Sequence, residues 1–528
     1  MYSLADKTIG TMPFRRLTDA ALGVYARRRV AALDRRSAAA VQRRILLDLV
    51  HRAGDTRFGR EHDFGHIRTV RDYQARVPLR DYEAFWSQYW STPFPHVRGV
   101  TWAGKIPYFG LSSGTTSGAT KYIPLSRDML ASNRKGALTS LALFVANHPG
   151  IPLLTGRLFF LGGSTDLIEA RPVISPDFLP RADHEKVLVG DLSGIVAREA
   201  SPLLRLFTFP PADMALLNDW DRKLDLLAEQ AYQLPITMLS GVPSWLLVLF
   251  ERLKKVSGRD RIADIWPGLR LVIHGGTRFD PYRTLFQREL GDSVHMLDTY
   301  PASEGYIASE DPRYGLLRLL PDNDIFFEFV PADELEAERP TRHTIGEIEP
   351  GVRYAVVLTT CAGLWGYVLG DTVCFEKRDP PLLRFTGRTR QFLSAFGEHL
   401  IGEEVERAIA SAAEDCGSAV VDFHVGPVFP DSPTAPGRHR FFVEFAGPTP
   451  DTGRFAAGLD SVLCEINEDY RAHRRGDLTL LPPEVRPVRP GGFADWMRSR
   501  GKLGGQHKVP RMDNTGQLTL QLDSFLTP

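Results

Sequence analysis

One stretch in the middle of the chain constrains the fold more than any other. Residues 269–276 (LRLVIHGG) have the apolar run of a buried strand, 279–290 (FDPYRTLFQREL) the pattern of a helix, and 294–301 (VHMLDTYP) that of a second strand. A strand, a helix and a strand in this order make a right-handed crossover between parallel strands. The sequence therefore predicts an α/β protein with a partly parallel sheet.

The regions on either side of this stretch follow other patterns. In the first hundred residues, Ser37 is a plausible N-cap for a helix with one apolar face, and 77–90 (VPLRDYEAFWSQYW) predicts a helix whose aromatic residues face the core. Beyond about residue 315, DIFFEFVP, RYAVVLTT and LWGYVLGDTVCFE are short strands separated by turns. They predict an antiparallel sheet or a small barrel.

A further break falls near Phe385, where FTGRTRQF carries turn and charge signals. The rest of the chain combines short strands with two helical patterns, which is typical of a small α+β domain. We therefore expect a large N-terminal domain, residues 1–385, of mixed sheets with a small β-barrel. A mobile small C-terminal domain, residues 386–528, would follow a hinge near 386–391.

Composition excludes several classes of protein. The 64 basic and 64 acidic residues give no net charge, which argues against a dedicated nucleic-acid or anionic-membrane binder. The four cysteines show no CxxC spacing, so a zinc ribbon or a disulfide scaffold is not expected. The N-terminus lacks a signal-peptide core, and the most apolar stretch, 234–250, is too interrupted to span a bilayer. We expect a cytoplasmic protein without a membrane partner.

The strongest local signal is a loop rich in glycine and hydroxylated residues, which ends near Lys121. In such a loop, backbone amides and hydroxyls can surround phosphate oxygens, and the lysine adds a positive charge. The spacing fits neither a Walker loop nor a dinucleotide fingerprint. The candidate phosphate-binding residues of this loop are Ser112, Ser113, Gly114, Thr115, Thr116, Ser117 and Gly118.

Four more motifs follow the loop in order: TYPASEG (299–305), YVLGD (367–371), TGRTR (386–390) and GGQHKVPR (504–511). Together they resemble the adenylate-forming superfamily of acyl-CoA synthetases, peptide-synthetase adenylation domains and luciferase. Within it, segments spread from about residue 45 to 512 are similar to the auxin-responsive Gretchen Hagen family of acyl acid amido synthetases. These segments are FGREHDF, VPLRDYE, SSGTTSG, FTGRTRQFLSAFGEHL, NEDYRAHR and KVPR.

The resemblance implies a reaction in two steps. A carboxylate is a poor electrophile, so ATP first converts it into an acyl-adenylate and releases pyrophosphate. An amine, such as an amino acid, then attacks the acyl-adenylate and AMP leaves. The protein mainly positions the reactants and stabilises charge. The expected substrates are ATP with Mg²⁺, a small carboxylic acid and an amine.

The resemblance also assigns roles to residues of the large domain. The loop 112–118 and Lys121 would hold the β- and γ-phosphates, and Glu304 would bind Mg²⁺, a hard cation that prefers carboxylate oxygens. Tyr300, in the same motif as Ser303, would stack on adenine, and Asp371 would accept hydrogen bonds from the ribose hydroxyls. The other face of adenine would be lined by Gly275, Gly276 and Thr277.

Two basic residues of the small domain complete the expected site. Lys508 would approach the α-phosphate and the carboxylate, and Arg388 lies at the hinge, where it either reaches the ribose or is a surface arginine. Two positions depart from the family pattern. Ala302 replaces the first serine of the YxSSE form, and His399 stands where plant members have a lysine, so a phosphate role for that position is in doubt.

Some readings stay open. An acyl-CoA or carrier-protein ligase shares the adenylation step, and an inactive nucleotide sensor would share the fold alone. His62 and His66 weakly suggest a metal site, which Gly65 and the lack of a glutamate make improbable. The helix near residues 141–144 and Trp245 are candidates for the acyl pocket, whose substrate no motif identifies.

Overall fold

The structure is a computed structural model, in which the chain folds into two compact units. Unit 1 comprises Met1–Gly241, Trp266–Gly276 and Val294–Arg384, and unit 2 comprises Val242–Ile265, Thr277–Ser293 and Phe385–Pro528. The described residues are 12–113, 120–162, 167–171, 186–199, 202–215, 217, 220–275, 279, 282–389, 392–393, 395–396, 398, 400–429, 436–467, 470–471, 474, 480–500 and 509–526. Among them, no helix is both long and apolar enough to cross a membrane.

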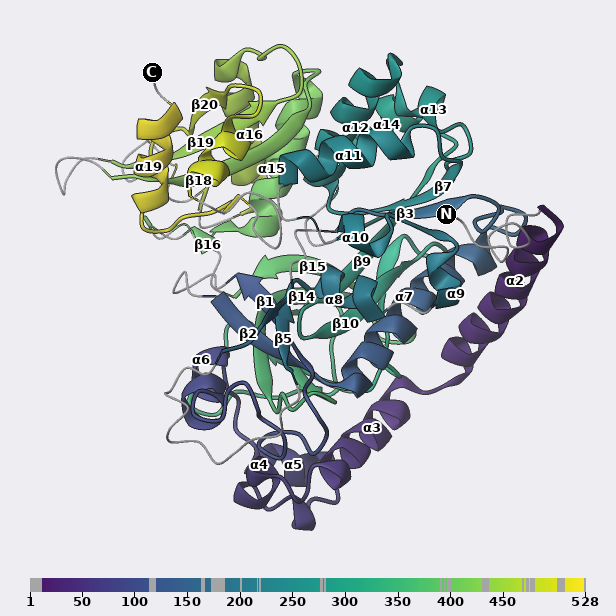
Figure 1. Cartoon of the computed structure of the whole chain (residues 1–528). Helices are drawn as coiled ribbons and strands as arrows, with labels where there is room; N and C mark the ends of the chain where they lie inside the picture. Colours follow the sequence, from purple (N-terminus) through teal and green to yellow (C-terminus); the bar gives the residue numbers. More distant parts are fainter. Residues whose placement is uncertain are drawn as a thin grey trace. The chain divides into compact units, whose positions relative to one another are not determined.

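Unit 1 contains the helices of the N-terminal part of the chain (Figure 1). They are α2 (Met12–Arg35), α3 (Ala38–Arg52), α4 (Arg57–Glu61), the 3-10 helix η1 (Phe64–His66), α5 (Val70–Arg76), α6 (Tyr82–Phe85), the π-helix η2 (Trp86–Trp90), α7 (Arg127–Asn147), α8 (Leu192–Glu199), α9 (Pro202–Arg205), α10 (Ala212–Ala215) and α11 (Trp220–Ala231).

An 11-stranded mixed sheet dominates unit 1. In spatial order its strands are β12 (Ile325–Pro331), β13 (Arg353–Thr360), β14 (Tyr367–Lys377), β15 (Leu382–Arg388), β11 (Leu316–Leu319), β10 (Gly305–Asp311), β9 (His295–Ala302), β8 (Leu271–Gly275), β7 (Ile236–Ser240), β3 (Arg157–Phe160) and β6 (Thr208–Phe209). A second sheet contains β2 (Thr120–Leu125), β1 (Tyr108–Ser113), β5 (Leu188–Gly190) and β4 (Ile168–Glu169).

The large sheet confirms the predicted α/β class. Strands β8 and β9 run parallel, with Leu271 opposite His295 and Gly275 opposite Thr299, as the predicted crossover requires. From β9 to β10 the direction reverses, and the later strands pair antiparallel. The strands that we expected to form an antiparallel sheet or a small barrel therefore belong to the same sheet as the parallel strands.

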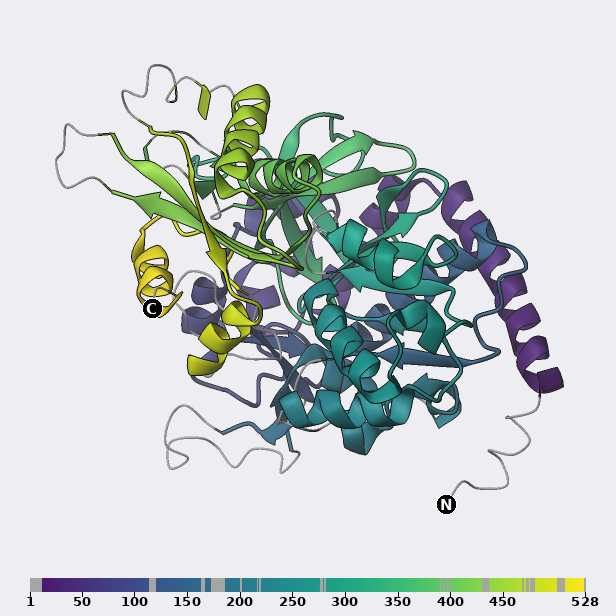
Figure 2. The same cartoon turned by 90° about the horizontal axis from the view of Figure 1, so that it is seen from above.

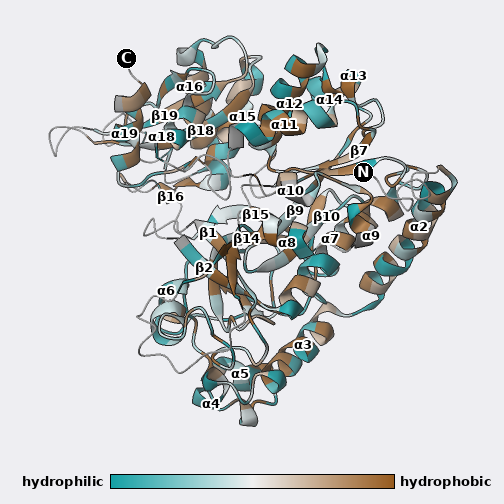
Figure 3. Ribbon diagram, in the orientation of Figure 1, coloured by the Kyte–Doolittle hydropathy of each residue, from teal (hydrophilic) through white to brown (hydrophobic). Residues whose placement is uncertain are grey.

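The N-terminal helices form as their local sequence predicts. The Ser37 side chain accepts a hydrogen bond from the Ala40 amide and caps α3. The buried side of α3 carries Gln42, whose amide donates to the Ile325 carbonyl and accepts from the Phe327 amide, which fixes the helix on strand β12. Figure 3 shows hydrophobic and hydrophilic residues on different sides of α3. The aromatic residues of α6 and η2 are largely buried, as predicted.

Helix α7 lies along the large sheet and positions one edge of the site described below. Its residues Leu141 and Phe144 pack in a core cluster with Leu158, Leu271 and Leu297 of the strands. The segment near 141–144, a candidate for the acyl pocket, thus packs against the sheet strands. On its outer side α7 packs with α2, which Figure 2 shows at the edge of the unit.

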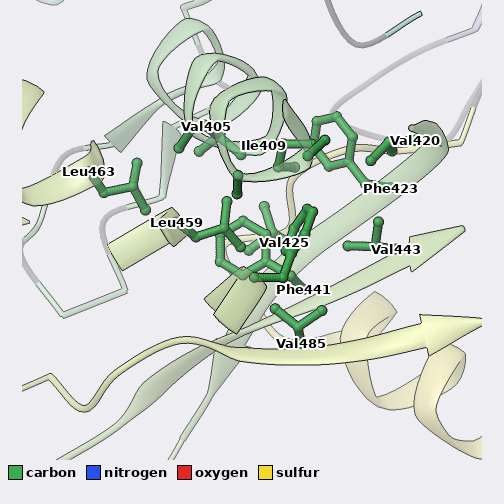
Figure 4. Packing of buried hydrophobic residues seen from close by; sticks show 14 of the residues in the cluster. Val405, Ile409, Val420, Phe423, Val425, Phe441, Val443, Leu459, Leu463 and Val485 are labelled. Carbon is green, nitrogen blue, oxygen red and sulfur yellow. The ribbon is translucent and has the colours of Figure 1, made fainter. Parts of the chain in front are cut away.

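Unit 2 has an α+β core, in agreement with the predicted C-terminal architecture. Strands β18 (Val420–Val428), β19 (Arg438–Phe445) and β20 (Glu484–Val488) form a sheet that packs on α15 (Gly402–Asp415) and α16 (Thr452–Ile466). Figure 4 shows their apolar side chains interdigitating. The other elements of the C-terminal segment are β16 (Phe392–Leu393), β17 (Leu400–Ile401), α18 (Gly492–Ser499) and α19 (Gln517–Leu526).

Unit 2 also includes α12 (Pro243–Ser257), α13 (Ile262–Ile265) and α14 (Arg283–Leu290), which the sequence placed in the large domain. A partly buried arginine joins these segments to the C-terminal residues. The Arg511 guanidinium donates to the Tyr282 hydroxyl at 2.7 Å and to a Glu406 carboxylate oxygen at 2.8 Å. Tyr282 and the carboxylates of Glu406 and Asp422 raise the pKa of Arg511 against the opposing effect of burial. Arg511 is therefore a charged anchor within this unit.

Candidate active site

A buried carboxylate occupies the turn between β9 and β10. Glu304 is 7% exposed, and the Tyr367 hydroxyl at the start of β14 donates to its Oε1 at 3.1 Å. Burial raises the pKa of Glu304, the nearby Asp371 raises it further, and its own backbone amide, Lys121 and Tyr367 act in the opposite direction. The effect of burial is the largest of these, so the ionised form is disfavoured relative to a carboxyl group in water.

A second carboxylate is held by a second tyrosine. The Tyr300 hydroxyl on β9 donates to Asp371 Oδ2 on β14 at 2.7 Å, and both residues are nearly buried. Strands β15, β11 and β10 separate these two strands in the sheet, which would place them roughly 19 Å apart on a flat sheet. The contact therefore requires the sheet to curl, and this curl brings the TYPASEG and YVLGD motifs together.

Lys121 approaches this pair of carboxylates from the other sheet of the unit. It lies on β2 directly opposite Ser112 on β1, so the two strands present both residues at the base of the predicted phosphate loop. The Lys121 ammonium is 5.4 Å from the centre of the Tyr82 ring, a cation–π distance. The positive charge is thus close enough to stabilise the ionised form of Glu304. Gly114, Thr115, Thr116, Ser117 and Gly118 lie outside the described residues, as does the Ser113 side chain.

The end of β8 approaches β9 so closely that only glycine fits. A Cβ on Gly275 would lie 2.4 Å from the Thr299 carbonyl oxygen, and the Thr299 hydroxyl donates to the His274 carbonyl at 2.8 Å. A side chain at this position would push apart the strands that carry Gly275 and Tyr300. This is a structural reason for the first glycine of the GGT segment. Gly276 and Thr277 lie outside the described residues.

The other predicted residues divide into two groups. Ser303 and Ala302 lie at the β9–β10 turn and are partly exposed, and Arg388 is exposed at the end of β15, in unit 2. Lys508, Arg390 and His399 fall outside the described residues. The described part of unit 1 thus brings together Ser112, Lys121, Gly275, Tyr300, Glu304 and Asp371.

The sequence analysis missed two tyrosines of the site. Tyr367 donates to Glu304, and Tyr82 lies beside Lys121. Tyr367 stands at the first position of the YVLGD motif, but its partner is 63 residues away, so no local pattern could identify the contact. His62 contacts the Phe58 carbonyl and Arg80, and His66 contacts Asp63. No cluster of three possible metal ligands occurs among the described residues.

The raised pKa of Glu304 predicts a stabilising substitution. Because the folded protein disfavours the ionised form, its stability falls as pH rises from the unfolded carboxyl's pKa to the higher folded one, and stays reduced above it. Glu304→Gln keeps the hydrogen bond from Tyr367 and removes the charge. We expect the ligand-free variant to melt about 1–3 °C above the wild type at neutral pH. Calorimetry at several pH values measures this difference, which should shrink towards pH 4. A variant that melts lower at every pH would contradict the assignment.

Family models and relatives match nearly the whole chain. The model of the GH3 family N-terminal domain matches residues 29–296, that of the central domain 318–388 and that of the C-terminal domain 403–517. The relative named "Probable indole-3-acetic acid-amido synthetase GH3.1" of Arabidopsis thaliana is 26% identical over 93% of this chain and 91% of its own length.

Solved structures share the fold. The structure of AtGH3.15 acyl acid amido synthetase in complex with 2,4-DB has a TM-score of 0.76 at 17% identity and covers 95% of this chain and 96% of its own. A 2-hydroxyisobutyryl-CoA ligase in complex with 2-HIB-AMP has a TM-score of 0.55 at 15% identity, with 92% of both chains covered. At these identities the likeness supports the architecture and leaves the substrate open.

Proposed function

Because the chain belongs to the GH3 family, we propose that it is an ATP-dependent acyl acid amido synthetase. It adenylates a small carboxylic acid and transfers the acyl group to an amine, such as an amino acid. The observation that carries the proposal is the grouping of Lys121 with two tyrosine-held carboxylates, Glu304 and Asp371. The lysine can bind phosphates, and the two carboxylates can bind a metal ion and hydroxyl groups.

The reaction conserves the energy of ATP in the acyl-adenylate. A carboxylate oxygen of the acid attacks the α-phosphorus, the bond to the β-phosphate breaks, and pyrophosphate leaves. The amine nitrogen then attacks the acyl carbon, AMP departs with the former carboxylate oxygen, and the nitrogen loses a proton. Both steps depend chiefly on holding the reactants in line and stabilising the charge that develops.

Asp371 is the proposed ribose-binding residue. The bond from Tyr300 to Oδ2 holds the carboxylate in place, and the carboxylate would accept hydrogen bonds from the ribose hydroxyls. The Tyr300 ring and Gly275 then border the adenine, with Gly276 and Thr277 as further candidates. This assignment predicts a preference for a nucleotide with both ribose hydroxyls, because each hydroxyl donates to a carboxylate oxygen.

Glu304 is the proposed Mg²⁺ ligand. Among the described residues, its buried carboxylate receives one side-chain hydrogen bond, from Tyr367, and its pKa is raised. A nearby cation would favour the ionised form. Mg²⁺ commonly uses one or two carboxylates together with substrate phosphates, and when bound it neutralises phosphate charge. Lys121 lies close enough to share the phosphate-binding role, together with the loop 112–118.

The remaining assignments rest on the motifs alone. We assign Lys508 to the α-phosphate and the acid carboxylate, Arg388 to the hinge or the ribose, and Ser303 to the nucleotide site. The hinge near 386–391 and the division at residue 385 are part of the same proposal, in which the small domain rotates between the two steps. A cytoplasmic location is supported by the four cysteines, which form no disulfide and so suit a reducing compartment.

A competition experiment tests the acceptor. The enzyme is incubated with ATP, Mg²⁺, an accepted acid, the twenty amino acids and coenzyme A, and the products are identified by mass spectrometry. We expect the amide to dominate, because the acceptor that is held and oriented reacts fastest. A thioester as the main product, with no amide even when coenzyme A is omitted, would identify an acyl-CoA ligase. A lack of ATP–pyrophosphate exchange with every acid would favour the nucleotide sensor.

A further inference from the structure

One polar side chain near Glu304 is buried without a partner. Asn133 on α7 is 7% exposed, and neither its amide nitrogen nor its amide oxygen has a hydrogen-bond partner among the described residues. Leaving both ends of an amide unpaired in a protein interior is costly and uncommon. The group is therefore expected to have a partner that the described residues do not supply.

Contacts on both sides of Asn133 locate it in the fold. One turn before it, the Met129 sulfur lies 3.7 Å from the position of a Cβ on Gly305. One turn after it, Gly136 approaches the Tyr306 ring so closely that a Cβ would be 2.5 Å away. Residues at this spacing share one face of a helix. Asn133 therefore faces the start of β10, immediately after Glu304.

Near Asn133, other polar groups are hydrogen-bonded to one another, and one neighbouring residue of α7 is exposed. The hydroxyls of Ser140 and Tyr306 are 2.7 Å apart, and Tyr306 also bonds to Thr299, so these three groups satisfy one another. Ala137, on the same side of α7 as Asn133, is exposed. Both polar atoms of the Asn133 amide are buried, so the amide is an unpaired polar group beneath this face.

The positions of the ends of β8 and β9 also indicate a ligand site near Asn133. Ligands bind in open α/β sheets at the carboxyl ends of the strands. Here β8 ends at Gly275, opposite Thr299, and β9 ends at Ala302. Leu141 and Phe144 of α7 cover the middle of these strands. Asn133 lies about 16 Å along the helix from Phe144, towards the turn that carries Glu304.

We infer that Asn133 is a specificity-determining residue that hydrogen-bonds a polar substituent of the carboxylic acid. The inference rests on the proposed function for the identity of the reaction. The amide supplies two donors and one acceptor oxygen, so it matches a hydroxyl, carbonyl or amide group on the acid. A purely hydrocarbon acid leaves it unpaired. The preferred substrate class is therefore a small carboxylic acid with a hydrogen-bonding substituent.

Pairs of acids that differ by one hydroxyl test the inference. They are benzoate and phenylacetate, each with its para-hydroxy derivative, and butyrate with its beta-hydroxy derivative, measured by pyrophosphate release. We expect the wild type to prefer the hydroxylated member of at least one pair. In Asn133→Leu and Asn133→Ala this preference should fall about tenfold to a hundredfold in kcat/KM, while the unsubstituted partner reacts as well as before or better. The ligand-free Asn133→Leu protein should melt no lower than the wild type.

Asn147→Leu is the matched control, because Asn147 lies on the same helix and its amide donates to the Leu143 carbonyl within α7. It should leave the preference unchanged. Equal losses for both members of every pair in the Asn133 variants would overturn the inference, as would a wild type that prefers the unsubstituted acid throughout.

A second measurement separates this inference from the proposed function. Acid selectivity that depends on Asn133, without any amide product, would refute the proposed acceptor and support the inference. If no acid releases pyrophosphate, the thermal shift that each acid induces in the wild type and in Asn133→Leu decides the matter. Acids that neither react with the enzyme nor raise its melting temperature would overturn both.

Discussion

Asp371→Ala should lower the rate of ATP–pyrophosphate exchange by roughly 10²–10³-fold, which corresponds to about 2.7–4 kcal/mol of lost transition-state stabilisation. In the proposed site the carboxylate of Asp371 holds the ribose, and the Tyr300 hydroxyl keeps it in place. Without it, the α-phosphate is no longer held in line with the attacking acid. We expect a loss of the same order for Glu304→Ala.

Glu376→Ala is the control for this prediction. Glu376 lies on the same strand as Asp371, but it is exposed and pairs with Arg384 on the surface. Its removal should change neither the exchange rate nor the melting temperature noticeably. Asp371→Ala with near wild-type exchange at saturating ATP would refute the ribose assignment. A variant that has lost its fold, judged by circular dichroism, would show a structural role instead.

Lys508→Ala should affect the two half-reactions unequally. If the small domain delivers Lys508 only for adenylation, the variant should form acyl-adenylate about 10²–10³-fold more slowly. It should convert a chemically prepared acyl-adenylate into the amide at nearly the wild-type rate. Rapid-quench measurements of each step separate the two effects.

Lys502→Ala is the matched control for charge, since it removes a lysine from the same segment of sequence. It should leave both steps unchanged. If Lys508→Ala slows both steps equally, Lys508 is either structural or used throughout the reaction. If both lysine variants slow adenylation, the segment acts through its total charge.

The sequence predicted those parts of the fold that depend on local pattern. The cap at Ser37, the parallel strands β8 and β9, and the helix–strand alternation after residue 400 follow from side-chain chemistry within short windows. The continuous sheet did not follow, because the pairing of β11 with β15 joins residues more than sixty positions apart. The grouping of α12–α14 with the C-terminal residues includes a contact between Tyr282 and Arg511, which are 229 positions apart.

The candidate site, too, was predicted only where local sequence motifs identify its residues. The motifs identified Tyr300, Glu304 and Asp371, since each stands at a fixed place in a recognisable segment. They did not identify what holds each carboxylate, because Tyr367 and Tyr300 reach their partners only through the curl of the sheet. Asn133 carries no sequence signal, since an asparagine within a helix is ordinary until its burial is known.

The anchored Arg511 limits how far Lys508 can travel. Three peptide units separate the two residues, so their Cα atoms can never be more than about 11 Å apart. The Arg511 side chain is bound to Tyr282 and Glu406, which makes it the fixed end of a short tether. Any phosphate that Lys508 serves must lie within reach of this tether, or the bonds of Arg511 must open first. In a nucleotide-bound structure, the distance from Arg511 to the α-phosphate would distinguish these two possibilities.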